Sequence, residues 1–248
     1  FINMIEQIKK DILDDSKKLA TILRKAKVLA STLLNKELST WVDNELRGYL
    51  NTNDKIPDYR KMNAENYGSF SGPFGSGLNN FPIPITILPD YAQKFAENCV
   101  FKEGVSEYES LLDGDSKVFH INWPPDLIAL VQHDVTIYQN MSLYHAYQQI
   151  SRGTVVGMLD MIRNNLLDFI LDLEKNYPEL IKSDEGMKKI PNEKVTSIFQ
   201  THIYGGTNVI TSGENINQNI QLNVIPNDIE SLKKYISSIG VPVSEVSE

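Results

Sequence analysis

Three stripes of apolar residues at helical spacing occupy the first 50 residues of the chain. Within each stripe the apolar positions recur every three or four residues, so they line one face of a helix. Asp14-Asp15-Ser16 offers a stop and a new cap between the first two stripes. We predict three helices between residues 4 and 50. The stripes are Ile5, Ile8 and Ile12, then Leu19, Ile22, Ala26, Leu29 and Leu33, and finally Leu38, Trp41, Val42, Leu46 and Tyr49.

Residues 51–90 break this pattern with many Gly, Pro and Asn residues. Proline removes a backbone donor and blocks the interior of a helix, so long helices are excluded here. We predict short strands at about 67–71 and 83–88. The second is expected at a sheet edge because it contains prolines.

Residues 91–176 return to helices and strands. YAQKFAENC and SEYESLL predict helices, KVFHINW predicts a strand, and PPDLIALVQHDV predicts a helix with prolines in its first turn. MSLYHAYQQIS fits either a strand or the lead into the next helix. The strongest helical stripe runs from 154 to 176, and we interpret it as the spine of the core. A coiled coil is less favoured because the stripe spans barely three heptads.

The C-terminal part changes character twice. Residues 179–197 are polar and charged, and we interpret them as a linker. Strands are predicted at about 198–204, 207–211 and 215–224, and a short helix in NDIESLKKYISSIG. In the last strand the even positions are Ile216, Gln218, Ile220, Leu222 and Val224, and asparagine or glutamine fills every odd one. One face of this strand is therefore apolar and the other carries amides.

These elements predict an α+β fold. We expect a mainly helical N-terminal domain at 4–178 with a small β insertion, a linker at 179–197, and a C-terminal β-ribbon with a short helix at 198–248.

Composition and charge narrow the classes of function. A net charge of -8 and a pI near 5.1 argue against a protein that mainly holds nucleic acid, because phosphate neutralisation needs a basic surface. The lysine-rich first helices are interpreted as a solvated face. Cys99 is the single cysteine, which excludes an intrachain disulfide and fits a cytoplasmic location. No apolar run approaches the roughly 20 residues of a membrane helix, so we expect no membrane contact through this part of the chain.

Candidate catalytic motifs are weak. GPFGSG at 72–77 lacks the Gly-Lys-Ser/Thr of a phosphate loop, and Asp113-Gly114-Asp115 is favoured as a tight turn over a metal site. His133-Asp134 lacks further ligands at helical spacing. Arg163, inside the apolar helix, is interpreted as a structural ion pair or a surface arginine rather than a ligand-reading group. We predict no catalytic, metal-binding or cofactor-binding residue and no cofactor.

Six motifs follow one another along the chain: LATILRKAKVLASTL (19–33), WVDNELRGY (41–49), IPDYRKM (56–62), GPFGSG (72–77), IPITILP (83–89) and GMLDMIRNNLLDFILDLE (157–174). Together they resemble the AbiTii domain of abortive-infection phage-defence proteins. The resemblance covers about residues 4–178 and implies a bacterial cytoplasmic protein that halts a phage-infected cell. It supplies no catalytic residues. The tail motifs HIYGGTNV and SGENINQ resemble an accessory segment of such proteins, which implies that a glycine-rich effector region can follow.

The alternating ribbon is the predicted oligomerisation site. A small ribbon cannot bury its own apolar face, so we predict that it packs against the same ribbon of another copy, with amide ladders between copies. Docking onto the chain's own helical domain is the alternative. The predicted oligomerisation residues are Tyr204, Asn208, Ile210, Ile216, Gln218, Ile220, Leu222 and Val224.

The leading hypothesis is a self-associating, non-enzymatic or scaffold-type effector of abortive infection. Its expected partners are copies of itself, through 198–224, and a phage-derived trigger. Two alternatives stay open. One is a metal-dependent nuclease or nucleotide hydrolase that uses Asp113, Asp115, His120 or His133. The other is a nucleic-acid-binding module that uses the basic first helices.

Overall fold

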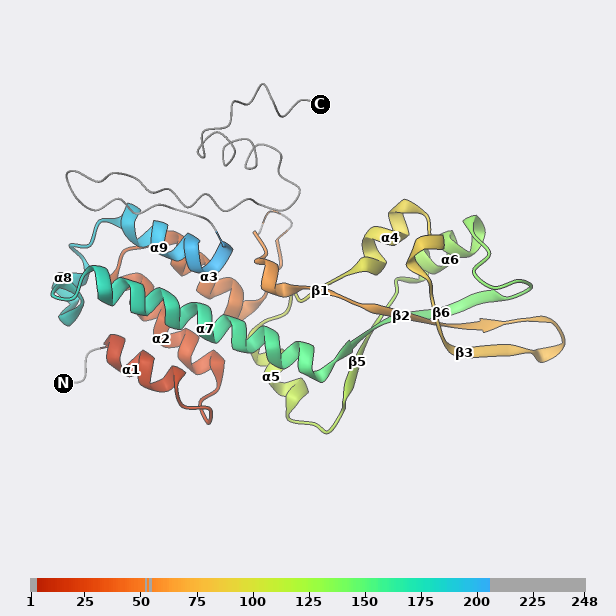
Figure 1. Cartoon of the computed structure of the whole chain (residues 1–248), viewed down its shortest axis with the longest axis horizontal. Helices are drawn as coiled ribbons and strands as arrows, with labels where there is room; N and C mark the ends of the chain where they lie inside the picture. Colours follow the sequence, from red (N-terminus) through yellow and green to blue (C-terminus); the bar gives the residue numbers. More distant parts are fainter. Residues whose placement is uncertain (1–3, 52, 54, 206–248) are drawn as a thin grey trace, which may run out of the picture.

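The computed structural model describes residues 4–51, 53 and 55–205, and it consists of two parts (Figure 1). A helical body contains α1–α3, α5 and α7–α9, and a sheet lobe contains a four-stranded sheet with α4 and α6. Each part has its own cluster of buried apolar side chains. The predicted α+β class is confirmed.

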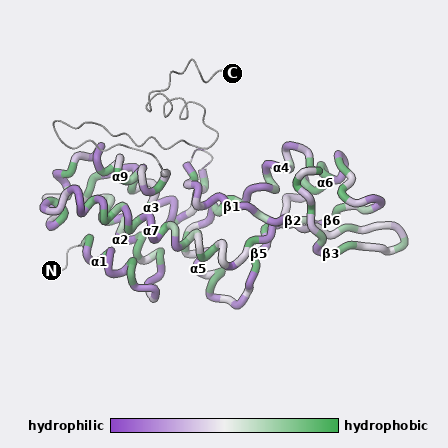
Figure 2. The backbone as a smooth tube through the Cα atoms, viewed as in Figure 1, coloured by the Kyte–Doolittle hydropathy of each residue, from purple (hydrophilic) through white to green (hydrophobic). Residues whose placement is uncertain are grey.

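The helical body is organised around α7. This helix contacts α1, α5 and α9, and its buried positions include Val155, Ile162, Leu166, Phe169 and Leu173, so the predicted spine is confirmed. Hydrophobic positions recur along the helices of the body (Figure 2). The body helices are α1 (Met4–Ile12), α2 (Leu19–Thr32), α3 (Lys36–Arg47), α5 (Val105–Leu112), α7 (Arg152–Asn176), α8 (Asp184–Met187) and α9 (Asn192–Tyr204), with short 3-10 turns η1 (Asp58–Arg60) and η4 (Leu180–Lys182). Across the described residues, no helix combines the length and the apolar character that a bilayer crossing requires.

Side chains cap the helices of the body. Asn35 accepts a hydrogen bond from the Leu38 N–H at 2.8 Å and so caps α3. The cap of α2 is long-range, because the Leu19 N–H donates to Glu109 Oε1 of α5. The predicted local cap at 14–16 is therefore wrong. The Asp14 carboxylate instead accepts from the Ser16 N–H at 3.0 Å and closes the turn after α1.

The sheet lobe is an antiparallel sheet covered on one face. The strand order is β3-β2-β6-β5, and α4 and α6 pack on the face that carries Phe70, Leu143 and Ala146. A short ladder of β1 and β4 leads from the body into the lobe (Figure 1). The elements are β1 (Lys61–Asn63), β2 (Glu65–Ser71), η2 (Pro73–Gly75), β3 (Gly77–Pro82), η3 (Ile85–Ile87), α4 (Asp90–Glu97), β4 (Asn98–Val100), β5 (Val118–Asn122), α6 (Pro125–Asp134) and β6 (Ser142–Ser151).

Strand β6 continues directly into α7, which joins lobe and body through one uninterrupted segment. The segment 142–151, whose pattern left two possibilities, is thus a strand. Ser151 ends it and caps α7 by accepting a hydrogen bond from the Thr154 N–H at 3.1 Å.

The strand predicted at 83–88 is wrong, because the edge strand lies one segment earlier, at 77–82. The Ile83 N–H still donates to Asn66 O at 2.8 Å, but Pro84 has no N–H with which to extend the ladder. The chain then turns through η3, which buries Ile83 and Leu88 in the core of the lobe.

Residues 179–197 are not a linker but part of the helical body. The polar residues face outward, while Ile181, Met187, Ile190 and Val195 are buried in the body core. Gly186 permits a close approach, since a Cβ there would lie 2.2 Å from Leu180 O.

Residues 198–204, predicted as a strand, are the second half of α9. Ile198, Phe199 and Ile203 are buried, a spacing that lines one helical face. Polar contacts also fix α9. Asn35 Nδ2 donates to Asn192 Oδ1 at 2.7 Å, and His202 Nε2 lies 2.7 Å from Asp172 Oδ2. The body therefore extends past the predicted boundary at 178. The strands predicted at 207–211 and 215–224 and the final helix lie outside the described residues.

Replacement of Phe199 with alanine tests whether α9 belongs to the core. The Phe199 ring packs edge-on against Trp41 and Phe169, with centroids 5.9 and 6.4 Å away. We expect Phe199→Ala to lower the free energy of unfolding by about 3–5 kcal/mol in urea denaturation. Leu171→Ala, at an exposed position of α7, is the control and should change it little. Equal, small losses for both variants would show that α9 does not pack as described.

Candidate functional site

A buried ion pair between Glu45 of α3 and Arg60 of η1 lies where the body meets the start of the lobe. Both side chains are fully buried. Arg60 Nη2 donates to Glu45 Oε2 at 2.5 Å, and its Nε lies 3.1 and 3.2 Å from the two carboxylate oxygens. Nη1 donates to the carbonyls of Phe101 and Glu103 at 2.7 and 2.9 Å. The guanidinium thus ties α3 to the connection between β4 and α5.

Two tyrosines complete the shell of the Glu45 carboxylate. The hydroxyls of Tyr49 and Tyr59 each donate to Glu45 Oε1 at 2.7 Å, and Trp41 Nε1 donates to the Tyr59 hydroxyl. Burial, followed by the charge of Glu45, raises the pKa of both phenols well above the usual range. Burial opposes the charge of Arg60, but the Glu45 carboxylate outweighs it and the pKa of Arg60 is raised. The charged and polar groups of this network are paired with one another or with backbone carbonyls. We therefore assign the network a structural role.

The face of the sheet opposite α4 and α6 carries aromatic and amide side chains. Tyr67 and Tyr147 stack with centroids 5.9 Å apart, and the His120 and His145 rings lie 4.2 and 5.7 Å from Tyr147. The Tyr147 hydroxyl donates to Asn80 Oδ1 at 3.1 Å. Side chains on alternate strand positions point to this face because the opposite positions fill the core of the lobe.

Amide partners continue across the same face. His120 Nε2 lies 3.3 Å from Gln149 Oε1, and His145 Nε2 lies 3.3 Å from Asn122 Oδ1. None of these described side chains is a lysine or arginine. The face can therefore stack and exchange hydrogen bonds with a neutral group, but these side chains do not supply the fixed cations that phosphates require.

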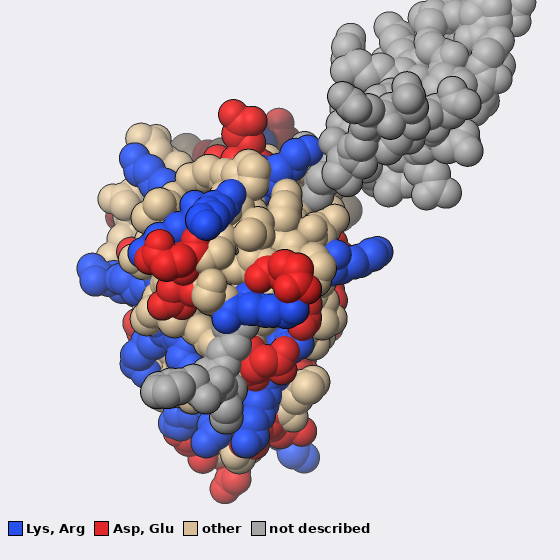
Figure 3. All heavy atoms as spheres, turned by 90° about the vertical axis from the view of Figure 1, so that its left-hand side faces the viewer, with Lys and Arg blue, Asp and Glu red and all other residues tan. Residues whose placement is uncertain are grey.

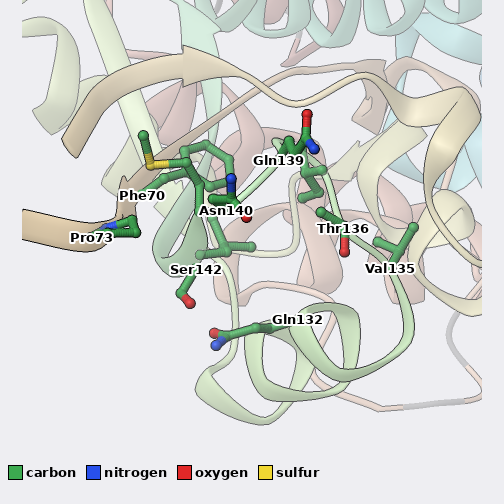
Figure 4. Close-up of a pocket in the computed structure, with 11 residues that line it drawn as sticks. Phe70, Pro73, Gln132, Val135, Thr136, Gln139, Asn140 and Ser142 are labelled. Atoms are coloured by element: carbon green, nitrogen blue, oxygen red, sulfur yellow. The ribbon is translucent and has the colours of Figure 1, made fainter. Parts of the chain in front are cut away.

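A cavity of about 600 Å³ lies at the far end of the lobe (Figure 4). The loop between α6 and β6 forms one wall, and the beginning of the β2–β3 hairpin forms another. Among the described residues that line it, none is ionisable at neutral pH, so the cavity offers hydrogen bonds without acid–base groups. The lining residues are Phe70, Pro73, Gln132, Val135, Thr136, Ile137, Gln139, Asn140, Met141, Ser142 and Leu143.

The acidic and histidine residues of the enzyme hypothesis are spread over three elements: the turn after α5, strand β5 and helix α6. Asp113 and Asp115 belong to the turn after α5, where Arg152 donates to Gly114 O at 2.6 Å. His120 contacts the sheet face, and His133 pairs with Asp134 at the end of α6. The described part of the chain contains no group of three His, Cys, Asp or Glu side chains placed to hold a metal ion.

The remaining motifs have structural explanations. GPFGSG forms the turn of the β2–β3 hairpin, as predicted, with Phe74 fully exposed. Arg163 donates to the carbonyls of Ile12 and Lys17 at 3.2 and 2.9 Å, so it holds the end of α1 rather than forming an ion pair with a neighbouring aspartate. Burial raises the pKa of the Cys99 thiol to about 11, which disfavours the nucleophilic thiolate at neutral pH.

Of the predicted oligomerisation residues, only Tyr204 lies within the described range. It contacts its own chain, with Lys55 Nζ 3.8 Å from the centre of its ring and Phe199 edge-on at 5.8 Å. The other predicted residues lie outside the described range: Asn208, Ile210, Ile216, Gln218, Ile220, Leu222 and Val224.

At the end of the body shown in Figure 3, lysine and arginine side chains are interspersed with acidic ones rather than gathered into one patch.

Sequence reasoning missed the buried network and the aromatic sheet face. A signal for Glu45 exists, because it follows Trp41 by four residues and lies within the apolar stripe of α3. No periodicity marks Arg60, since a single 3-10 turn carries it. Tyr67 and Tyr147 are opposite each other because of the register between β2 and β6. The residue pattern of a single strand does not reveal that register.

Comparison with known proteins gives one result. A family model described as AbiTii matches residues 3–199, which includes α9 up to Phe199. No curated protein and no solved structure matches.

Neutralisation of Glu45 tests the importance of the buried pair. Glu45→Gln keeps the shape of the side chain but leaves the buried Arg60 without its counter-charge, so we expect a loss of about 3–5 kcal/mol in the free energy of unfolding. Asp43→Asn is the matched control, because Asp43 lies on the same helix and pairs with Lys27 at the surface. That variant should lose less than about 1 kcal/mol. If urea denaturation shows a similar loss of unfolding free energy for both variants, the buried pair does not contribute more to stability than a surface pair.

Proposed function

We propose that this chain, which belongs to the AbiTii family, acts by self-association and binding rather than by catalysis. The family places it in abortive infection, a defence against phage. Within that role, the proposal is that copies of the chain assemble through the C-terminal alternating segment and that assembly precedes the effect on the infected cell.

The observation that carries the proposal is the alternation in residues 215–224. Ile216, Ile220 and Leu222 would give a strand one apolar face, and a single small ribbon has too little surface of its own to bury it. The body core offers little room nearby, because α9 already fills it with Phe199 and Ile203, which are 1% and 4% exposed. Burial against another copy removes the apolar face from water.

The chemistry of the described residues supports a binding role. Tyr49 and Tyr59, whose pKa values are strongly raised, and Arg60, whose pKa is also raised, belong to the closed network around Glu45. Perturbed groups in an enzyme site would instead be expected to face a cleft. The large cavity and the uncovered sheet face present amide, hydroxyl and aromatic groups, which suit recognition.

A charged substitution within the segment tests self-association. Ile220→Asp places a carboxylate on the apolar face, where burial of each isoleucine contributes about 1.5–3 kcal/mol. We expect the variant to keep the circular dichroism of the wild type, to run as a smaller particle in light scattering, and to lose phage protection. Asn219→Asp adds the same charge to the amide face and is the control, which should keep more of both properties. A wild type that is monomeric at micromolar concentration would refute self-association.

Combined alanine substitutions test the binding role against catalysis. We expect Asp113→Ala, Asp115→Ala, His120→Ala and His133→Ala together to leave phage protection intact, because these side chains are spread over three elements and are not buried. Protection is measured by plaque counts, and the fold by thermal melting. A well-folded quadruple variant without protection would favour the hydrolase alternative.

A further inference from the structure

The two edges of the sheet differ in how they are protected. At the β3 edge, Pro82 lacks a donor, its carbonyl accepts a hydrogen bond from the Tyr138 hydroxyl at 2.6 Å, and a bulge between Gly68 and Phe70 of β2 disturbs the register. Proline and bulges are the usual means of blocking strand addition. Strand β5 has neither, and its five residues pair with β6 in an unbroken register.

The backbone of β5 presents unused hydrogen-bonding groups. The Trp123 N–H donates to Ala146 O and the Arg152 N–H to Lys117 O, both at 2.8 Å, so the odd-numbered residues of β5 bond to β6. Inward and outward groups alternate along an antiparallel strand, so the N–H and C=O groups of Val118, His120 and Asn122 point away from the sheet. Among the described residues, no backbone group bonds to these outward groups.

The side chains of β5 are also exposed and uncharged. Val118 and Ile121 are 41% and 39% exposed, and the strand reads VFHIN. An edge strand without charge, proline or bulge is a template for another strand.

The two faces beside β5 match the two faces of the alternating segment. His120 and Asn122 lie on the uncovered amide face, whereas Phe119 and Ile121 lie on the apolar face. A strand added at this edge would continue both faces if it carried amides on one side and aliphatic residues on the other. Residues 215–224 have this pattern, apart from Gln218 on the aliphatic side, and no charged residue.

We propose that the β5 edge accepts residues 215–224 of a second copy of this chain as an additional strand. The amides of that segment extend the face of His120 and Asn122, and Ile216, Ile220 or Leu222 covers Ile121. This inference rests on the proposed self-association and specifies its contact, which is strand addition to the lobe rather than a ribbon packed on a ribbon.

A second copy is the occupant because the proposed assembly joins copies through this segment, and the reach of the chain limits the alternative. The described part of the body ends at α9, which packs along α7 (Figure 1). From Gly205 to Asn215 the chain spans ten residues, 215 minus 205, or about 33–36 Å when fully extended. An intramolecular strand at the β5 edge would have to start within that reach of the end of α9.

Edge-blocking variants of the full chain test the inference. His120→Pro removes one outward N–H and leaves the bonds of β5 to β6 in place, so it should fold and raise the dissociation constant about tenfold or more in analytical ultracentrifugation. His120→Ala is the matched comparison: it removes the imidazole but keeps the outward N–H, so it should weaken assembly less than His120→Pro does. Ile121→Lys is a second variant, which keeps every backbone bond but adds a charge on the apolar face, and it should also weaken assembly.

Mixing two defective variants gives a sharper result. His120→Pro has an intact segment, and Ile220→Asp has an intact edge. At a concentration where each variant alone is mainly monomeric, an equimolar mixture should therefore form a heterodimer. If Ile220→Asp weakens assembly while His120→Pro and Ile121→Lys do not, strand addition is refuted and self-association stands. A monomeric wild type refutes both. A monomer whose β5 amide exchange accelerates in Ile220→Asp would show that the chain's own segment occupies the edge.

Discussion

The charged pair of Glu45 and Arg60 imposes the central constraint on this structure. A buried ion pair is tolerated only when its polar atoms have hydrogen-bond partners. Here two tyrosine hydroxyls donate to Glu45, and two backbone carbonyls accept from Arg60. Its members come from α3, from η1 and from the connection between β4 and α5, so these segments must meet in one geometry. The segments that carry the pair, WVDNELRGY and IPDYRKM, are also motifs of the AbiTii family resemblance.

Further polar contacts connect this junction to the lobe. Asn66 of β2 extends the polar bonding into the lobe, since its Oδ1 accepts from Trp123 Nε1 at 3.1 Å and its Nδ2 donates to Ala96 O at 2.7 Å. Together with the continuous β6–α7 segment, these contacts connect a closed helical body to a sheet with one covered and one uncovered face. The body supplies the anchor, and the lobe supplies the exposed edge and the amide face that the proposed assembly uses.

The apolar periodicity of the sequence correctly predicted the helices whose position depends on burying one face. The stripes of α1, α2, α3 and α7 follow from the need to bury one helical face, and the structure begins the spine at Arg152 rather than at 154. The predictions failed where contacts between segments distant in the sequence determine the structure. Ile181, Met187 and Val195 are too widely spaced among charged residues to signal a core segment, and Ile198, Phe199 and Ile203 fit a helix only once Asn192 and His202 hold α9 against its neighbours. The partner of Glu45 and the register that joins Tyr67 to Tyr147 depend on residues far apart in sequence, which no local pattern contains.

Amide hydrogen exchange of the wild-type chain, followed as its concentration rises, tests the central claim that assembly covers the β5 edge. The outward N–H groups of Val118, His120 and Asn122 should exchange quickly in dilute protein and slow down together with the increase in particle mass. The N–H groups of Phe119 and Ile121, which bond within the sheet, should be protected at every concentration. A particle mass that rises while the three outward amides remain fast would contradict the account.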